Sequence, residues 1–236
     1  MKRNRLTFFG HAAFRIVTEA GLKIWIDPWL DNPQAPEDVR QDLSADIILI
    51  THAHGDHLGN CIEMAATSAT EVVAIHEIQQ YLLTKGVPNV TGMNIGGSYS
   101  TKGVTITMVP AIHSSSIQEG NELIYGGEAA GFIVTLEDGA TKVYHAGDTA
   151  LYGDMAMLGT LYRPTVALLP IGDHYVMGPK EAAYACRLLA PKTVVPMHYG
   201  TFPVLTGTAK EFERELKAQH ADAALEVMAP GESLEF

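Results

Sequence analysis

Three histidines and an aspartate stand close together in the segment THAHGDH, which spans residues 51–57. They are His52, His54, Asp56 and His57. Imidazoles packed this closely repel one another when protonated and are costly to bury, whereas a divalent cation takes neutral imidazole and carboxylate as natural ligands. The segment therefore predicts a metal site.

The spacing within this segment favours two metal ions. Residues 52, 54 and 56 alternate along an extended stretch, and His57 follows at a turn into a helix, so the four side chains need not all reach one ion. An open catalytic zinc commonly takes three protein ligands, and one loop here offers four. A binuclear centre with ions about 3.5–4 Å apart would use all of them.

Strands must position these side chains. The sequence predicts ten strands from ten short apolar runs, most of which are rich in β-branched residues. The runs cover residues 6–9, 14–18, 22–26, 46–50, 71–75, 104–109, 131–136, 141–146, 165–170 and 192–197. The first three are close enough for a meander of antiparallel strands. Several later runs are continuously apolar, which is typical of strands buried on both faces beneath helices.

Four segments between the runs predict helices, namely residues 60–69, 76–85, 179–190 and 208–219. The first begins with Asn60 as a cap, and the last opens with Thr208 and Glu211 at capping-box spacing. Strands covered by helices on their outer faces make a layered α/β domain. No linker-like stretch divides the chain, so we expect one domain over residues 1–236.

Five of the apolar runs are each followed by a histidine or a carboxylate. Besides the 51–57 segment, these residues are His113, Asp148, Asp173 with His174, and His198. In sheets with helices on their faces, sites form outside the carboxyl ends of the strands, where loops converge. We therefore expect these side chains to meet at such an edge.

At these residues the chain resembles the metallo-β-lactamase superfamily. The match runs through HxHxDH, a lone histidine, the aspartate of a Gly-Asp pair and a late histidine, in the same order and spacing. The words GHAAF, HAGDT, LPIGD and MHYGTFP are similar to those of small metal-dependent hydrolases akin to ascorbate-6-phosphate lactonase. The resemblance implies a four-layer αββα sandwich with its site at one edge of the two sheets.

The resemblance also implies a role for each ligand. His52, His54 and His113 would hold the first ion, Asp56, His57 and His198 would hold the second, and Asp148 would bridge both. Asp56 would be catalytic as well, by orienting the nucleophile. The expected cofactors are two divalent ions; zinc suits this ligand set, and manganese, iron and nickel fit similar ones.

The predicted activity is that of a binuclear metal-dependent hydrolase, in which a metal-bridging hydroxide attacks a small ester, lactone or phosphodiester. Two alternatives stay open: a thioesterase of the glyoxalase II type, and a metal-binding sensor or scaffold without turnover. The chain departs from the RNA-processing branches, which carry an inserted nuclease domain, and from flavodiiron proteins, which carry a flavodoxin-like domain.

Composition limits the partners. The 16 basic and 27 acidic residues give a formal net charge of −11, which argues against nucleic acid held by phosphate neutralisation. Nothing approaches the apolar length of a membrane span, and the basic start does not match a signal peptide. We expect a cytoplasmic protein with a small-molecule substrate, no stable membrane insertion and two reduced cysteines; a homo-oligomer stays open.

Other polar residues could assist the site. His11 is interpreted either as a hydrogen-bonding partner of the substrate or as a surface or supporting residue. His145 is expected to support the ligands or the core, and Cys61 to pack. Asp173 and His174 could orient a ligand or a substrate group.

Two long loops, residues 27–43 and 113–130, are long enough to act as lids. In the first, Trp29 and Leu30 could form an apolar wall of the pocket or could simply pack the turn after the third strand.

Overall fold

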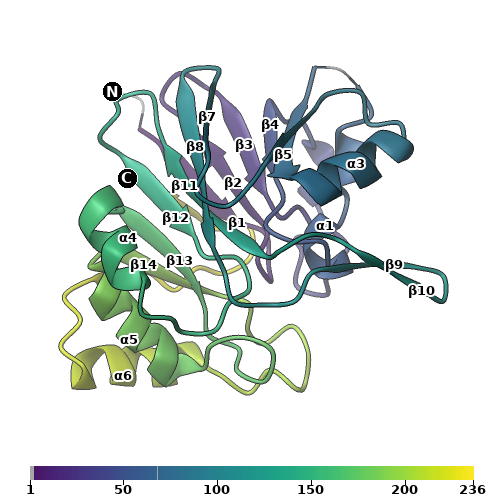
Figure 1. The fold of residues 1–236 in the computed structure, drawn as a ribbon. Helices are drawn as coiled ribbons and strands as arrows, with labels where there is room; N and C mark the ends of the chain where they lie inside the picture. The colour runs from purple at the N-terminus through teal and green to yellow at the C-terminus, as the bar shows by residue number, and fades with distance from the viewer. Residues whose placement is uncertain (1–2, 68) are drawn as a thin grey trace. The chain divides into compact units, whose positions relative to one another are not determined.

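The computed structural model describes residues 3–67 and 69–236 of the chain. These residues group into two compact units, each with a seven-stranded sheet and helices (Figure 1). Unit 1 contains residues 1–97, 114–129 and 229–236, and unit 2 contains residues 98–113 and 130–228. The mixed α/β architecture matches the prediction, whereas a single domain over residues 1–236 stays a prediction.

The sheet of unit 1 begins with antiparallel strands and ends with parallel ones. Its order is β16 (Ser233–Glu235), β1 (Arg5–Phe8), β2 (Phe14–Val17), β3 (Lys23–Ile26), β4 (Ile47–Leu49), β5 (Glu71–Ile75) and β6 (Val90–Met93). Pairing is antiparallel from β16 to β3 and parallel from β3 to β6. The predicted meander is thus confirmed. Strands β4 and β5 are buried along their whole length, which explains why every residue in them except Glu71 is apolar.

Short helices and one hairpin complete unit 1. The helices are α1 (Gly55–Leu58), α2 (Cys61–Met64), α3 (His76–Thr84) and the 3₁₀ turn η1 (Val39–Gln41). Strands β9 (Ser116–Glu119) and β10 (Glu122–Tyr125) pair antiparallel as a separate ribbon. Figure 1 shows this ribbon extending away from the seven-stranded sheet of the unit, beside α3.

The sheet of unit 2 also combines antiparallel and parallel strands. Its order is β15 (Ala224–Leu225), β14 (Thr193–Met197), β13 (Val166–Pro170), β12 (Lys142–His145), β11 (Ala130–Thr135), β8 (Val104–Pro110) and β7 (Ser98–Thr101). Strands β12 to β15 run parallel, and the remaining pairs are antiparallel. Helices α4 (Met155–Tyr162), α5 (Pro179–Leu189) and α6 (Ala209–Ala218) lie together beside this sheet (Figure 1).

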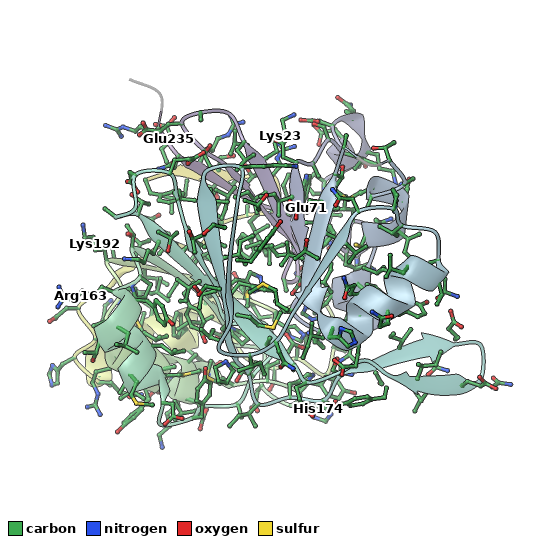
Figure 2. The ribbon with its side chains drawn as sticks, turned by 45° about the horizontal axis from the view of Figure 1, so that its top comes forward. Lys23, Glu71, Arg163, His174, Lys192 and Glu235 are labelled. Carbon is green, nitrogen blue, oxygen red and sulfur yellow. The ribbon has the colours of Figure 1, made fainter. Side chains whose placement is uncertain are left out.

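Parallel pairing brings the ends of several strands to one edge within unit 2. Figure 2 shows Arg163 and Lys192, which precede β13 and β14, at one end of the sheet and His174, which follows β13, at the other. Asp148 and His198 follow β12 and β14, so they leave the sheet at the same end as His174. This is the edge at which the sequence predicted the ligand-type residues.

All ten predicted strands are present, and three of the four predicted helices match closely. In α6 the Thr208 side chain accepts the Glu211 N–H, which confirms the capping box. The helix predicted over residues 60–69 is wrong in length, because α2 ends at Met64. Asn60 is the N-cap residue of α2, as predicted, but its side chain makes no capping hydrogen bond, since it accepts the Leu30 N–H and donates to two carboxylates.

Among the described residues, no helix combines the length and the apolar character that crossing a bilayer requires.

The contact between α4 and α5 depends on a glycine. A Cβ added at Gly159 would come within 2.5 Å of the Leu188 carbonyl oxygen and 2.7 Å of that of Leu189. Gly153, at the start of α4, has open space around it. We expect Gly159→Ala to destabilise the protein by about 1–3 kcal/mol, because the helices must move apart, and Gly153→Ala to be near neutral. The midpoints of denaturant unfolding would measure the stability of both variants. Equal midpoints for Gly159→Ala and Gly153→Ala would contradict the role of Gly159.

Candidate metal centre

One buried carboxylate organises the ligand-type residues of unit 1. Asp27 directly follows β3, which pairs in parallel with β4, so it lies at the edge where the 51–57 segment begins. It accepts hydrogen bonds from the Thr51 N–H (2.8 Å), the Thr51 hydroxyl (2.6 Å) and His57 Nδ1 (2.8 Å). Asp27 is fully buried, and three donors offset the cost of burying its charge.

These hydrogen bonds fix the tautomers of two histidines. Because His57 Nδ1 donates to the Asp27 carboxylate, its Nε2 presents an electron pair. The Thr51 hydroxyl gives its only proton to Asp27, so it accepts from His52 Nδ1 at 3.0 Å. His52 Nε2 therefore presents an electron pair too. Carboxylate–histidine contacts of this kind orient metal ligands in proteins.

His52 and His54 are arranged as neighbouring ligands of one ion. His52 Nε2 and His54 Nδ1 are 3.0 Å apart. Two nitrogens bound to one zinc at about 2.0–2.1 Å are about 3.3–3.4 Å apart in tetrahedral geometry and about 2.8–3.0 Å apart in octahedral geometry. The separation thus equals an octahedral edge and is slightly shorter than a tetrahedral one.

The partly exposed Asp56 side chain contacts a buried histidine. Its Oδ2 lies 3.2 Å from His11 Nε2, and the side chain of His11 is completely buried while that of Asp56 is 28% exposed. Ligand atoms of His11, Asp56 and His57 all lie within 4.8 Å of one another. The ring of Trp29 meets His11 edge-on. The interpretation of His11 as a surface residue is therefore wrong; it lies directly behind Asp56.

Unit 2 supplies a second set of donors around Asp148. Its Oδ2 lies 2.9 Å from His198 Nε2 and 3.6 Å from His113 Nε2. Asp148 and His198 are almost fully buried, and His113 is 13% exposed. One carboxylate oxygen thus faces two imidazoles. Carboxylates and imidazoles that bind metals are commonly in contact with one another in this way.

Strained backbone marks both sets. Asp27, His11 and His198 have φ angles of 48°, 54° and 54°, in the left-handed region that side chains with a Cβ rarely adopt. Such strain persists where the surroundings determine the conformation, and it clusters at functional sites. The backbone at His198 also packs closely against Gly172. A Cβ added at Gly172 would lie only 2.1 Å from the His198 carbonyl oxygen.

His145 and Cys61 have structural roles. His145 is buried and its Nδ1 accepts the Gly147 N–H, which shapes the turn that carries Asp148. Burial, with a contribution from Asp27, raises the pKa of the Cys61 thiol well above its usual value. Burial also raises the pKa of Cys186 to about 12. Both cysteines are free and buried, so they pack as neutral thiols.

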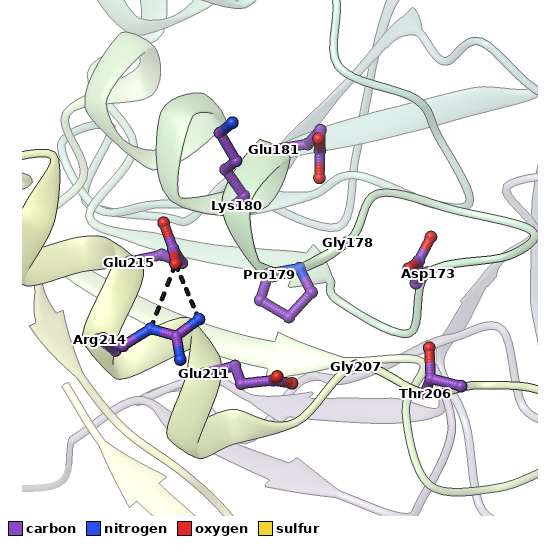
Figure 3. A pocket seen from close by; sticks show the side chains of 10 residues that line it. All are labelled: Asp173, Gly178, Pro179, Lys180, Glu181, Thr206, Gly207, Glu211, Arg214 and Glu215. Atoms are coloured by element: carbon purple, nitrogen blue, oxygen red, sulfur yellow. Dashed lines mark hydrogen bonds and ion pairs between the residues drawn. The ribbon is translucent and has the colours of Figure 1, made fainter.

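Asp173 lies close to the start of α5, and His174 follows it in the loop after β13. Both are exposed, and Asp173 lines a cavity of about 380 Å³ with the starts of α5 and α6, as Figure 3 shows. The cavity is bordered by the acidic side chains of Glu181, Glu211 and Glu215 and by two basic ones. None of the seven predicted ligands lines it, so a ligand-orienting role for Asp173 and His174 stays a prediction.

The two long loops are not free segments. Residues 27–43 contain η1 and are fastened to α2, since Arg40 pairs with Asp31 and Glu63. Residues 113–130 contain the β9–β10 hairpin. Trp29 is half-buried against His11, and Leu30 is buried.

The chain is similar to known proteins in both sequence and fold. A family model described as the beta-lactamase superfamily domain matches residues 22–199. A UPF0173 metal-dependent hydrolase of Rubrobacter xylanophilus is 51% identical, over 98% of this chain and 96% of that protein. One of Methanopyrus kandleri is 46% identical, over 98% and 99%. Igni18, a metallo hydrolase of Ignicoccus hospitalis with a solved structure, is 39% identical, with a TM-score of 0.87 over 99% and 98% of the two chains.

The chain belongs to this family of metal-dependent hydrolases. The predicted fold class, an α/β metallo-β-lactamase type, is confirmed by these likenesses, as is the prediction of a metal-dependent hydrolase. The donor sets described above suit such an enzyme, because each unit presents imidazole nitrogens and carboxylate oxygens in positions fixed by buried neighbours.

The sequence interpretation missed Asp27 and Thr51. It considered residues 27–43 as a lid, and Trp29 as a wall of the pocket or as packing of the turn after the third strand, but gave Asp27 itself no role. A signal was present, since Asp27 follows an apolar run in the same way as the five ligand-type segments that were recognised. The parallel pairing of β3 with β4 brings this carboxylate to His57, and this pairing is seen only in the structure.

The tautomer argument yields a direct test. Asp27→Asn replaces an acceptor facing His57 Nδ1 with an amide that favours the opposite tautomer, so His57 Nε2 would carry the proton. We expect the fold to persist and metal affinity, measured by competition with a chelator, to fall about 10–100-fold. Asp138→Asn, which removes an exposed carboxylate bound to Thr141, should bind metal normally. Equal affinities in both variants would contradict the assignment.

Proposed function

We propose that this hydrolase cleaves a small ester, lactone or phosphodiester with two divalent metal ions. His52, His54 and His113 would hold one ion and Asp56, His57 and His198 the other, while Asp148 would contact both. The observation that carries the proposal is the Asp27 network, which presents Nε2 of His52 and His57 as electron-pair donors. A structural histidine cluster has no need of two imidazoles aligned in this way.

The ligand chemistry supports zinc as the metal. All seven proposed ligands are histidines and aspartates, and both cysteines are buried as neutral thiols. Manganese, iron and nickel accept similar ligands, so availability in the cell takes part in the choice. Two such ions would supply hydroxide at neutral pH, by lowering the pKa of water from about 16 to about 7, and would polarise the oxygen of the electrophile.

The side chains of the chain itself would bind, orient and hold the reacting groups. Asp56 is the proposed catalytic carboxylate, because one of its oxygens contacts His11 while part of the side chain remains exposed to incoming water and substrate. His11 would orient that carboxylate through this contact. Fixing a nucleophile's partner in advance removes much of the entropic cost of the reaction.

A substrate panel tests the activity and ranks the bond types. Protein purified without added metal would first be analysed for its elements and then reconstituted with zinc or manganese. Hydrolysis of bis-p-nitrophenyl phosphate, aryl esters, lactones and thioesters would be compared with and without a chelator. We expect chelator-sensitive turnover on at least one of the oxygen esters. A metal-loaded protein inactive on the whole panel would contradict the proposal and favour a sensor or scaffold.

Asp56→Asn tests the proposed catalytic role. The amide keeps the size and one acceptor oxygen but loses the charge, so the fold should persist while kcat falls at least about 100-fold, the contribution typical of a positioned acid–base group. Asp154→Asn, at the start of α4, serves as the matched control and should turn over normally. An unchanged kcat in metal-replete Asp56→Asn would refute the role.

A further inference from the structure

A serine outside the proposed ligand set holds the backbone between His52 and His54. The N–H of Ala53, the intervening residue, donates to the Ser115 hydroxyl at 3.1 Å. The same hydroxyl donates to the Gly126 carbonyl at 3.2 Å. Ser115 is buried, and its hydroxyl suits the position because it accepts and donates at once.

Gly126 presses on the same segment. A Cβ at Gly126 would lie 2.3 Å from the Ala53 Cβ and 3.1 Å from the Ser115 hydroxyl oxygen, so the position has no room for a side chain. The Gly126 N–H also donates to the Ser115 carbonyl at 3.1 Å, which closes the base of the hairpin beside Ala53. Ala53 is thus held by a hydrogen bond and by direct backbone contact.

The hairpin that carries these residues is itself anchored. A two-stranded ribbon alone is at best marginally stable in water. Here the Tyr81 hydroxyl of α3 donates to Glu119 of β9 at 2.8 Å, and the Lys85 ammonium pairs with the same carboxylate. Figure 1 shows α3 and the ribbon side by side. The hairpin therefore braces Ala53 as part of a fixed element rather than as a loose loop.

The position of Ala53 determines how its two neighbours are placed. His52 Nε2 and His54 Nδ1 are 3.0 Å apart, and a small movement of the intervening peptide would change that separation. A second contact comes from the same segment, since the Ser114 hydroxyl lies 3.4 Å from His54 Nε2. Metal ligands depend on such supporting contacts for their geometry.

We propose that Ser115 is a positioning residue, which sets the separation of the His52 and His54 ligand nitrogens before a metal binds. The proposal rests on the proposed function in one respect, namely that these two histidines are ligands. Ser115 itself contacts neither ion nor substrate. Its contribution is to hold the Ala53 peptide, so that binding a metal does not require the segment to reorganise.

Three substitutions isolate the hydroxyl. Ser115→Ala removes it, Ser115→Thr retains it, and Ser115→Cys keeps a similar size but offers only a weak donor and acceptor. Ser116→Ala is the matched control, because this neighbouring serine lies in strand β9 of the same hairpin. Circular dichroism and thermal melting would establish that each variant folds.

The first measurement is amide exchange at Ala53 in the metal-free protein, followed by nuclear magnetic resonance. We expect the Ala53 amide to exchange at least about tenfold faster in Ser115→Ala and Ser115→Cys, because its buried acceptor is gone or weak. Ser115→Thr and Ser116→Ala should retain wild-type protection. This readout requires neither metal nor activity.

The second measurement is cobalt(II) affinity, from competition with a chelator, together with the visible spectrum of the cobalt protein. Affinity should fall about tenfold or more in Ser115→Ala and be restored in Ser115→Thr. Faster Ala53 exchange with unchanged cobalt affinity and spectrum would overturn the positioning role. Unchanged exchange would overturn the contact itself. Wild-type protein that takes up no cobalt would instead refute the proposed function, and the wild-type baseline alone reveals that outcome.

Discussion

The constraint on which the site depends is the burial of the Asp27 carboxylate. A charge placed in the core must be satisfied by donors, and Asp27 obtains them from Thr51 and His57. Those donors are the residues that flank or belong to the HxHxDH motif, so satisfying the charge also orients the histidines. The arrangement requires β3 and β4 to run in parallel, which brings Asp27 and Thr51 to the same sheet edge. The sheet topology thus allows the Asp27 charge to be buried, and the hydrogen bonds that satisfy this charge fix the tautomers of the imidazoles.

Both units place their chemistry in the same way. Each has a sheet that changes from antiparallel to parallel pairing, and in each most donors follow parallel strands: Asp27 and the HxHxDH segment in unit 1, and Asp148 and His198 in unit 2. His113 instead follows the antiparallel strand β8. In each, a glycine also allows backbone to press closely on a donor segment. Gly126 does so at Ala53, and Gly172 at His198. Rigid strand ends and close backbone contacts hold the donors at fixed positions, which a metal site requires before the ion arrives.

Much of this could be predicted from the sequence because buried strands leave a clear signal. The ten apolar runs all became strands, since burial on one or both faces demands apolar residues. Strands with few apolar residues, such as β7 (SYST) and β16 (SLE) at sheet edges, gave no such signal. Helix α4 was missed, and α2 ends at Met64, well before the predicted end at residue 69. The position of Asp27 after an apolar run was a signal in the sequence, but the hydrogen-bond partners of Asp27 and Ser115 could not be predicted, because they are set by strand pairing and by a hairpin that no local pattern specifies.

Anomalous diffraction from crystals grown with zinc, recorded at the zinc edge, would test the central claim most directly. The account predicts two peaks about 3.5–4 Å apart. One would be ligated by His52, His54 and His113, the other by Asp56, His57 and His198, with Asp148 on both and Asp27 hydrogen-bonded behind His57. A single peak, or zinc bound by other side chains while His52 and His57 remain unligated, would contradict it.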